Sequence, residues 1–143
     1  IFLIIIGDNI PLNMKNYFER KKIPNENFLL LDHQKNIEQY YNIVDLFVVT
    51  SLWGEGFSNV LGEAMNNSLP VLASDIGENR KILNNEKLIF AHGNKSNFIN
   101  NFKNIYKLNN IKREEIGKIL KKIIINKYDI LQISKKYEEL YKK

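Results

Sequence analysis

The 143 residues carry a formal net charge of +5, with 44% hydrophobic and 26% charged residues, which is the composition of one ordinary globular domain with a real core. There is no cysteine, which excludes disulfides and thiolate metal sites and is consistent with a reducing compartment. The longest apolar run, residues 1–6, is too short to span a bilayer and has no preceding basic region, so we expect a soluble protein.

The first elements predicted are a strand and a helix. Residues 1–6 form a continuous, β-branched apolar run, typical of a strand buried in a parallel sheet with neighbours on both sides. Gly7-Asp8-Asn9 ends this strand, and Asn9 tolerates a left-handed backbone conformation. An amphipathic helix is expected over residues 11–22, because Pro11 favours a helix start and Pro24-Asn25 ends the pattern.

A second buried strand is expected over residues 27–31, followed by the polar loop Asp32-His33-Gln34. Ligands of α/β sheets bind at the carboxyl ends of strands, so Asp32 and His33 are candidates for ligand contact. A lone histidine in a loop is also commonly a solvated residue, and both interpretations stay open. Residues 36–44 predict a short helix with buried aromatic residues, and residues 46–49 a third strand.

The stretch from Thr50 to Ser74 contains the strongest signal in the sequence. A turn with a glycine on each side of Glu55 lets another molecule approach the main chain closely. Ser58 is the expected N-cap of a helix whose first amides, those of Asn59, Val60 and Leu61, have no partner within the helix. Together with the helix dipole these amides form an anion site suited to phosphate.

The helix that follows is amphipathic. Its buried stripe is predicted to consist of Val60, Leu61, Ala64 and Met65, with Asn59, Glu63 and Asn66 along one flank. Glu63 lies about 6 Å along the helix axis from the open amides, a natural distance between a phosphate and a sugar hydroxyl. A carboxylate can accept hydrogen bonds from two neighbouring hydroxyls, so Glu63 suits a ribose and Glu55 a second polyol.

Two glutamates at this spacing occur on many α/β surfaces, and alone they are weak support for a site. The whole run is more specific. Glu55-x7-Glu63, within Glu-Gly-Phe-Ser-Asn-Val-Leu-Gly-Glu-Ala-Met and followed by Leu-Pro-Val-Leu-Ala-Ser-Asp-Ile-Gly, resembles the C-terminal, nucleotide-sugar-binding half of retaining GT-B glycosyltransferases. The most similar group is family four, the group 1 glycosyl transferases.

The resemblance implies a role for each residue of the motif. In such enzymes the first glutamate contacts the donor sugar, the segment after it holds the sugar and the diphosphate, and the second glutamate holds the ribose. These roles fall here on Glu55, Gly56 and Phe57 for the donor sugar, on Ser58, Asn59 and Val60 for the diphosphate, and on Glu63 for the ribose. Glu55 is the expected catalytic residue because it orients the donor, and Asp32 and His33 become weak candidates for the base.

The remaining elements predict an α/β fold with a doubly wound parallel sheet, Rossmann-like, followed by C-terminal helices. Strands are expected over residues 71–73 and 88–90, with residues 74–80 as a loop beside the donor site, and helices over 96–108, 112–126 and 130–142. Two positions depart from the family: Ser68 replaces a common helix-ending glycine, and Lys81 a common glutamate. If Ser68 is left-handed, it costs about 1 kcal/mol.

The expected reaction is sugar transfer from a nucleoside diphosphate sugar to an acceptor sugar or lipid-linked glycan. Helix amides and basic side chains neutralise the leaving diphosphate, so neither a metal nor another cofactor is expected, and no Asp-x-Asp or histidine cluster is present. Residues 1–143 are interpreted as a partial C-terminal donor domain, whose first strand, diphosphate-gripping Arg and Lys, and N-terminal acceptor domain lie upstream. The isolated chain is therefore expected to have little or no activity.

Two alternatives come from other classes: a non-catalytic nucleotide or nucleotide-sugar binding module, and a nucleotide-sugar epimerase, which the Glu-Gly-Phe motif disfavours. The lysine-rich surface is expected to be solvated rather than to bind nucleic acid. We expect a cytoplasmic protein of polysaccharide or glycoconjugate biosynthesis, with at most peripheral contact on the inner face of a membrane.

Overall fold

The computed structural model describes residues 1–53 and 56–142, so Gly54, Glu55 and Lys143 lie outside the described residues. The chain divides into two units, residues 1–39 and residues 40–143. Each unit contains its own parallel sheet, with the first formed by β1 and β2 and the second by β3, β4 and β5.

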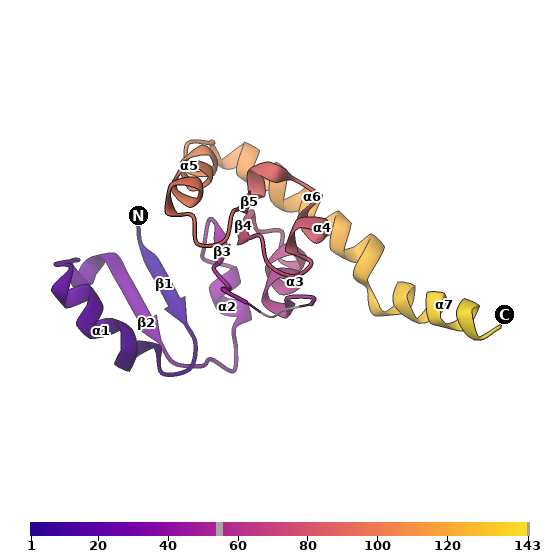
Figure 1. Ribbon diagram of the computed structural model, residues 1–143, viewed down its shortest axis with the longest axis horizontal. Helices are drawn as coiled ribbons and strands as arrows, with labels where there is room; N and C mark the ends of the chain where they lie inside the picture. The colour runs from indigo at the N-terminus through magenta and orange to yellow at the C-terminus, as the bar shows by residue number, and fades with distance from the viewer. Residues whose placement is uncertain (54–55, 143) are drawn as a thin grey trace. The chain divides into compact units, whose positions relative to one another are not determined.

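The first unit is a β-α-β arrangement. β1 (Leu3–Ile6) pairs in parallel with β2 (Phe28–Leu31), and α1 (Ile10–Arg20) lies along this pair (Figure 1). The helix is held by Phe18, which is buried and meets Phe28 edge-on with ring centroids 4.6 Å apart. Asn9 has a φ of 58° at the helix start, which confirms that asparagine serves there as a left-handed residue.

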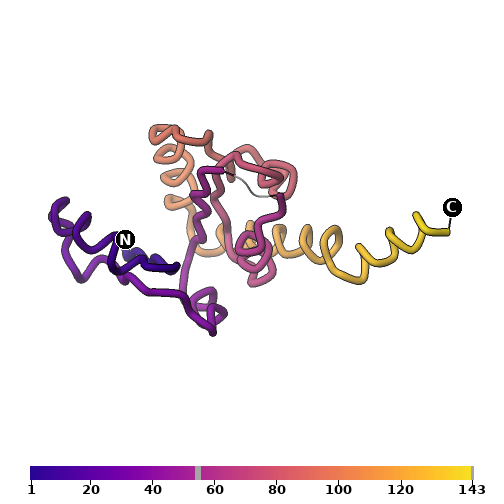
Figure 2. The backbone as a smooth tube through the Cα atoms, turned by 60° about the horizontal axis from the view of Figure 1, so that its bottom comes forward, coloured from indigo at the N-terminus to yellow at the C-terminus, as the bar shows by residue number. Residues whose placement is uncertain are grey.

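The second unit begins within α2 (Glu38–Tyr41) and continues as alternating strands and helices. Its elements are β3 (Phe47–Val49), α3 (Asn59–Asn66), β4 (Val71–Ser74), α4 (Asn79–Leu83), β5 (Ile89–Phe90), α5 (Lys95–Tyr106), α6 (Asn110–Tyr128) and α7 (Ile130–Tyr141). Single 3-10 turns, residues 25–27 and 86–88, precede β2 and β5. Figure 2 follows the chain through these strands and out along α6 and α7.

Strand β4 is the centre of the second sheet. It pairs in parallel with β3 on one side and β5 on the other, and all four of its residues are buried. Because parallel strands end at the same edge, the loops after β3, β4 and β5 meet at one edge of this sheet. The five predicted strands and the α/β class are confirmed, with the parallel pairing divided between two sheets. The predicted burial of β1 and β2 is wrong, because neither contains a buried residue and, among the described residues, each pairs only with the other.

Helix α3 packs on the sheet through fewer residues than the sequence predicts. Leu61, Ala64 and Met65 are fully buried as expected, but Val60 is 44% exposed, so its assignment to the buried stripe is wrong. The reason is helical geometry, because Val60 lies one residue, about 100°, before the side of the helix that carries these three. Val60 instead faces outward in the first turn, beside the open amides.

One further helix, α4, differs from the sequence prediction. Residues 79–83 form α4, although residues up to Arg80 are expected as a loop, because a helix of five residues is too short to show a period. In α7 none of the described residues is buried, and this helix extends from the end of α6 (Figure 1). Among residues 1–53 and 56–142, no helix has the length and apolar character needed to cross a bilayer.

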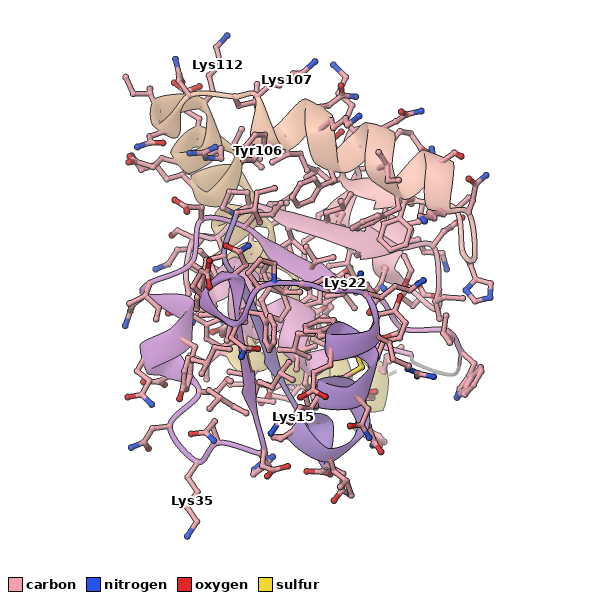
Figure 3. The ribbon with its side chains drawn as sticks, turned by 90° about the vertical axis from the view of Figure 1, so that its left-hand side faces the viewer. Lys15, Lys22, Lys35, Tyr106, Lys107 and Lys112 are labelled. Atoms are coloured by element: carbon pink, nitrogen blue, oxygen red, sulfur yellow. The ribbon has the colours of Figure 1, made fainter. Side chains whose placement is uncertain are left out.

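The lysines follow the solvated pattern that was expected. Lys35 in the first unit and Lys112 in the second are exposed, and both side chains extend away from the ribbon in Figure 3. An exposed lysine keeps its ammonium group in water and stabilises the fold little.

The C-terminal end of α3 is locked in place. Ser68 N–H donates to the Met65 carbonyl at 3.0 Å, and Leu69 N–H donates to the Ala64 carbonyl at 3.1 Å, which together make a Schellman motif. Helix α6 lies so close that a Cβ added to Gly117 would come 1.7 Å from the Ser68 carbonyl oxygen. Only glycine fits at this contact. Because the C-terminal end of α3 is held in this way, the direction of the helix and the position of its N-terminal end are fixed as well.

The Schellman motif places Ser68 in the left-handed region, with a φ of 60°. This is the conformation for which a cost of about 1 kcal/mol is expected from the sequence. We therefore predict that Ser68→Gly raises the free energy of unfolding by about 1 kcal/mol, because glycine has no Cβ that would clash with the backbone at this φ. Urea denaturation of both proteins measures the change. Ser68→Ala keeps the strain and should unfold like the parent, and an unchanged stability of Ser68→Gly would contradict the prediction.

Candidate functional site

The start of α3 has the geometry that the sequence predicts for an anion site. Ser58 is the N-cap, with an extended backbone, and its carbonyl accepts the Gly62 N–H at 3.1 Å. The amides of the three residues between them therefore have no partner within the helix. The Ser58 side chain makes no capping bond, and its hydroxyl, on a residue 1% exposed, has no hydrogen-bond partner among the described residues.

The two residues before Ser58 border the same open surface. A Cβ added to Gly56 would meet nothing within 4 Å, so a ligand can approach the main chain there. The Phe57 ring lies over Gly62, where an added Cβ would come 3.0 Å from it, and its centroid is 5.2 Å from that of Tyr128 on α6. Phe57 therefore anchors the turn to α3 and α6 while keeping part of its surface exposed.

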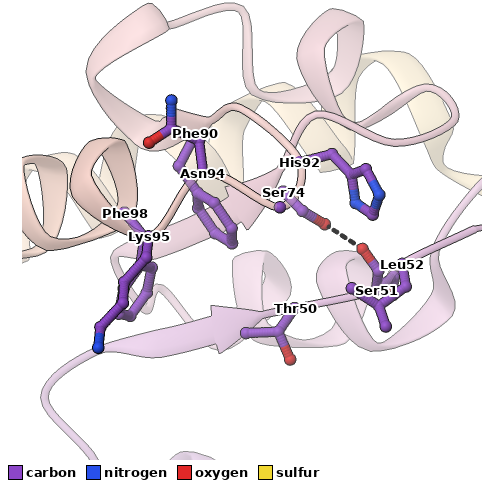
Figure 4. A pocket seen from close by; sticks show the side chains of 10 residues that line it. Thr50, Ser51, Leu52, Ser74, Phe90, His92, Asn94, Lys95 and Phe98 are labelled. Carbon is purple, nitrogen blue, oxygen red and sulfur yellow. Dashed lines mark hydrogen bonds between the residues drawn. The ribbon is translucent and has the colours of Figure 1, made fainter.

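The loops after β3 and β4 are tied together. The Ser74 hydroxyl donates to the Ser51 carbonyl at 2.8 Å (Figure 4), and Glu78 N–H donates to the Gly56 carbonyl at 3.3 Å. Asn79 is buried, and its Nδ2 donates to the Ser74 carbonyl at 3.1 Å. These bonds confirm that the loop after β4 lies beside the turn that leads into α3.

Glu63 lies on the exposed flank of α3, with Asn59 and Asn66 exposed on the same side as predicted. Its Oε2 accepts a hydrogen bond of 2.8 Å from the hydroxyl of Tyr41. Burial, together with the neighbouring carboxylate, raises the pKa of the Tyr41 hydroxyl well above its ordinary value, so Tyr41 stays a donor. Sequence reasoning placed Tyr41 in the core but missed this contact, because 22 residues separate the partners.

The basic residues of α4 are engaged with carboxylates. Arg80 donates to Asp75 from Nε at 3.0 Å and from Nη2 at 2.7 Å, and it also bonds Glu86. These bonds from Arg80 lower the pKa of Asp75. Lys81, where the family often has glutamate, pairs with Glu78 at 2.9 Å. Arg80 and Lys81 thus hold the loop together, and no sequence pattern predicted these pairings.

The remaining candidates are Asp32, His33, Glu55 and Trp53. Asp32 and His33 are exposed at the carboxyl end of β2 and belong to the first unit. Glu55 lies outside the described residues. Trp53 is 78% exposed.

A pocket of about 230 Å³ lies at the carboxyl edge of the second sheet (Figure 4). Its walls come from Thr50–Leu52 after β3, from Ser74, and from the turn between β5 and α5, including His92 and Lys95. None of the described residues that are predicted to bind the donor lines it. Across residues 1–53 and 56–142, no group of three or more His, Cys, Asp or Glu side chains could hold a metal ion.

The arrangement can therefore bind an anion and a pair of hydroxyls at once. The open amides of α3 suit a phosphate. One turn further along the same helix, Glu63 presents a carboxylate that suits a diol. The two groups are held in fixed register because they share one helix.

Comparison with known proteins connects this geometry to a family. The family model described as glycosyl transferases group 1 matches residues 1–123. The curated proteins contain no match to the chain.

Solved structures match over nearly the whole chain. Anabaena Alr3699/HepE in complex with UDP aligns with a TM-score of 0.86 at 20% identity, covering 99% of this chain and 41% of that one. The same protein in complex with UDP-glucose aligns with a TM-score of 0.83 at 20% identity, covering 99% and 40%. A glycosyltransferase from Rickettsia africae ESF-5 aligns with a TM-score of 0.78 at 20% identity, covering 99% and 39%. The chain thus shares their fold and spans about two fifths of their length.

Proposed function

The chain belongs to the glycosyl transferases group 1 family and has its Rossmann-like GT-B fold, and we propose that it binds the nucleoside diphosphate sugar donor of a retaining, family-four glycosyltransferase. The observation that carries this proposal is the open start of α3 with Glu63 one turn inside the same helix. The binding of UDP and UDP-glucose by the structurally similar Anabaena protein supports a nucleotide-sugar donor.

In this proposal the diphosphate lies on the amides of residues 59–61, and Glu63 accepts hydrogen bonds from the ribose hydroxyls. Gly56 and Phe57 border the donor sugar, and Glu55 orients it. The buried Ser58 hydroxyl, which has no partner among the described residues, is a further donor for a diphosphate oxygen. Asp32 and His33 are assigned to the nucleotide base on their position after β2 alone.

The chemistry follows from where charge develops. Loss of the nucleoside diphosphate leaves positive charge on the sugar ring and negative charge on the diphosphate, and the dipole of α3 stabilises the latter. We propose that transfer needs no metal, and that a phosphate oxygen takes the acceptor's proton on the face from which the diphosphate leaves. Glu55 then acts by positioning the donor rather than as a nucleophile.

An acceptor-binding domain completes the proposed enzyme. We propose that this domain lies upstream, together with an Arg and a Lys that grip the diphosphate. The chain itself covers about 40% of the length of the similar proteins. The acceptor is proposed to be a sugar or lipid-linked glycan, and the location cytoplasmic, with at most peripheral membrane contact. Calorimetry of the protein with a panel of nucleoside diphosphates and their sugars tests the proposal, which fails if none binds.

The isolated chain allows donor binding to be measured separately from sugar transfer. We predict that purified residues 1–143 bind the donor nucleotide yet transfer little or no sugar, because the acceptor site is contributed by another domain. Robust sugar transfer by this chain, measured as release of the nucleoside diphosphate with an acceptor present, would refute the division of roles.

Removing the carboxylate of Glu63 tests the ribose assignment. We predict that Glu63→Ala weakens binding of every nucleoside diphosphate, with and without its sugar, by roughly 1–3 kcal/mol through the loss of a charged hydrogen bond. Calorimetry measures the affinities. Glu115→Ala removes an exposed glutamate on α6 and should bind like the parent. Undiminished affinity of Glu63→Ala would show that Glu63 does not contact the nucleotide.

Removing the carboxylate of Glu55 should act on the sugar instead. We predict that Glu55→Ala weakens binding of the nucleotide sugar but spares the bare nucleoside diphosphate, because the proposed contact is with the donor sugar alone. The same calorimetric titrations with both ligands give the comparison. Equal losses for both ligands count against the assignment.

A further inference from the structure

Tyr41 links the core of the second unit to the candidate ribose carboxylate. The residue is 4% exposed, and its ring meets Phe47 of β3 edge-on, with centroids 5.5 Å apart. Its hydroxyl donates to Glu63 Oε2 at 2.8 Å. The hydroxyl of a buried tyrosine on α2 therefore bonds to an exposed carboxylate on α3.

This hydrogen bond restricts Glu63. A glutamate on the surface of a helix samples several rotamers, and ordering it for a ligand costs free energy at the moment of binding. The Tyr41 hydroxyl fixes Oε2 before the ligand arrives and leaves Oε1, together with the second lone pair of Oε2, available to accept from two ligand hydroxyls. Asn67 donates to the main-chain carbonyl of Glu63, from Nδ2 at 2.9 Å and from its N–H at 3.0 Å, and these bonds leave the carboxylate free to turn.

Packing alone does not require this hydroxyl. A phenylalanine would fill the same space against Phe47, whereas a tyrosine hydroxyl taken from water must find a partner to offset its desolvation. The partner found here is a charged carboxylate, which makes a shorter and stronger bond than a neutral acceptor does. The hydroxyl is thus explained by what it does to Glu63.

We propose that Tyr41 is a positioning residue for the donor nucleotide, holding the Glu63 carboxylate in the orientation that accepts the two ribose hydroxyls. This inference rests on the proposed function, in which Glu63 binds the ribose. The hydroxyl of Tyr41 then increases the affinity for the nucleotide only by orienting Glu63, without touching the nucleotide itself.

Tyr41→Phe removes the hydroxyl and keeps the ring. We expect it to bind UDP about two- to ten-fold more weakly, the effect of ordering one flexible side chain on binding. Binding of 2′,3′-dideoxyuridine diphosphate, which has no ribose diol, should be unchanged by the substitution. Calorimetry with both nucleotides gives the affinities, and a thermal unfolding curve checks that the variant is folded. Tyr106→Phe, which removes an exposed tyrosine hydroxyl on α5, should match the parent with both nucleotides.

A second pair of proteins separates this inference from the function on which it rests. In a Glu63→Ala background, adding Tyr41→Phe should cause no further loss of UDP affinity, because the hydroxyl then has no carboxylate to hold. If Glu63→Ala weakens UDP binding while Tyr41→Phe binds UDP like the parent, the positioning role is wrong and the ribose role of Glu63 stands. Equal losses from Tyr41→Phe with UDP and with the dideoxy nucleotide, or in both backgrounds, overturn the role in favour of a general effect on the fold. If Glu63→Ala binds UDP undiminished, both the ribose assignment and the role of Tyr41 fail.

Discussion

The fixed position of α3 is the constraint on which the candidate site depends. Its C-terminal end is closed by the Schellman motif at Ser68 and pressed against α6 at Gly117. Its buried side rests on the sheet through Leu61, Ala64 and Met65. What is left open is the other end, where amides without partners face the loops after β3 and β4. Because packing fixes the direction of the helix, its dipole and the free N–H groups of its first turn point in one fixed direction, where they favour an anion.

Much of the fold follows from local rules that act within a few residues. Continuous apolar runs predict the parallel strands, although β1 and β2 contain no buried residue. Helical periodicity predicts α1, α5, α6 and α7 within a few residues of their bounds. Asn9 could be recognised as a left-handed position because asparagine tolerates that conformation, and Ser68 because similar proteins commonly have a helix-ending glycine there. The N-cap position of Ser58 was predictable because serine favours that position, although its hydroxyl makes no capping bond.

The rest depends on which distant residues meet, and a sequence does not record that. Tyr41 reads as a core aromatic residue by its spacing, yet its hydroxyl reaches Glu63 on another helix. Val60 is apolar, but it lies at the edge of the packed side of α3 and faces outward.

Contacts between loops were equally hidden in the sequence. Arg80 has no recognisable partner in the sequence pattern, but in the structure it pairs with Asp75 and Glu86. The pocket beside Ser74 and His92 arises only from three strand ends meeting at one edge of a sheet. Glu55 stays a prediction from the motif.

The complete burial of β4 has a consequence for how the second unit opens. Its amides bond to strands on both sides and are shielded from solvent, so local fluctuations do not expose them. Their exchange with deuterated water then requires the three-stranded sheet to come apart as a whole, whereas the amides of α7, which has no buried residue, exchange through local fraying. Hydrogen exchange of the β4 amides thus reports the global stability of the second unit, and it can be measured without any ligand.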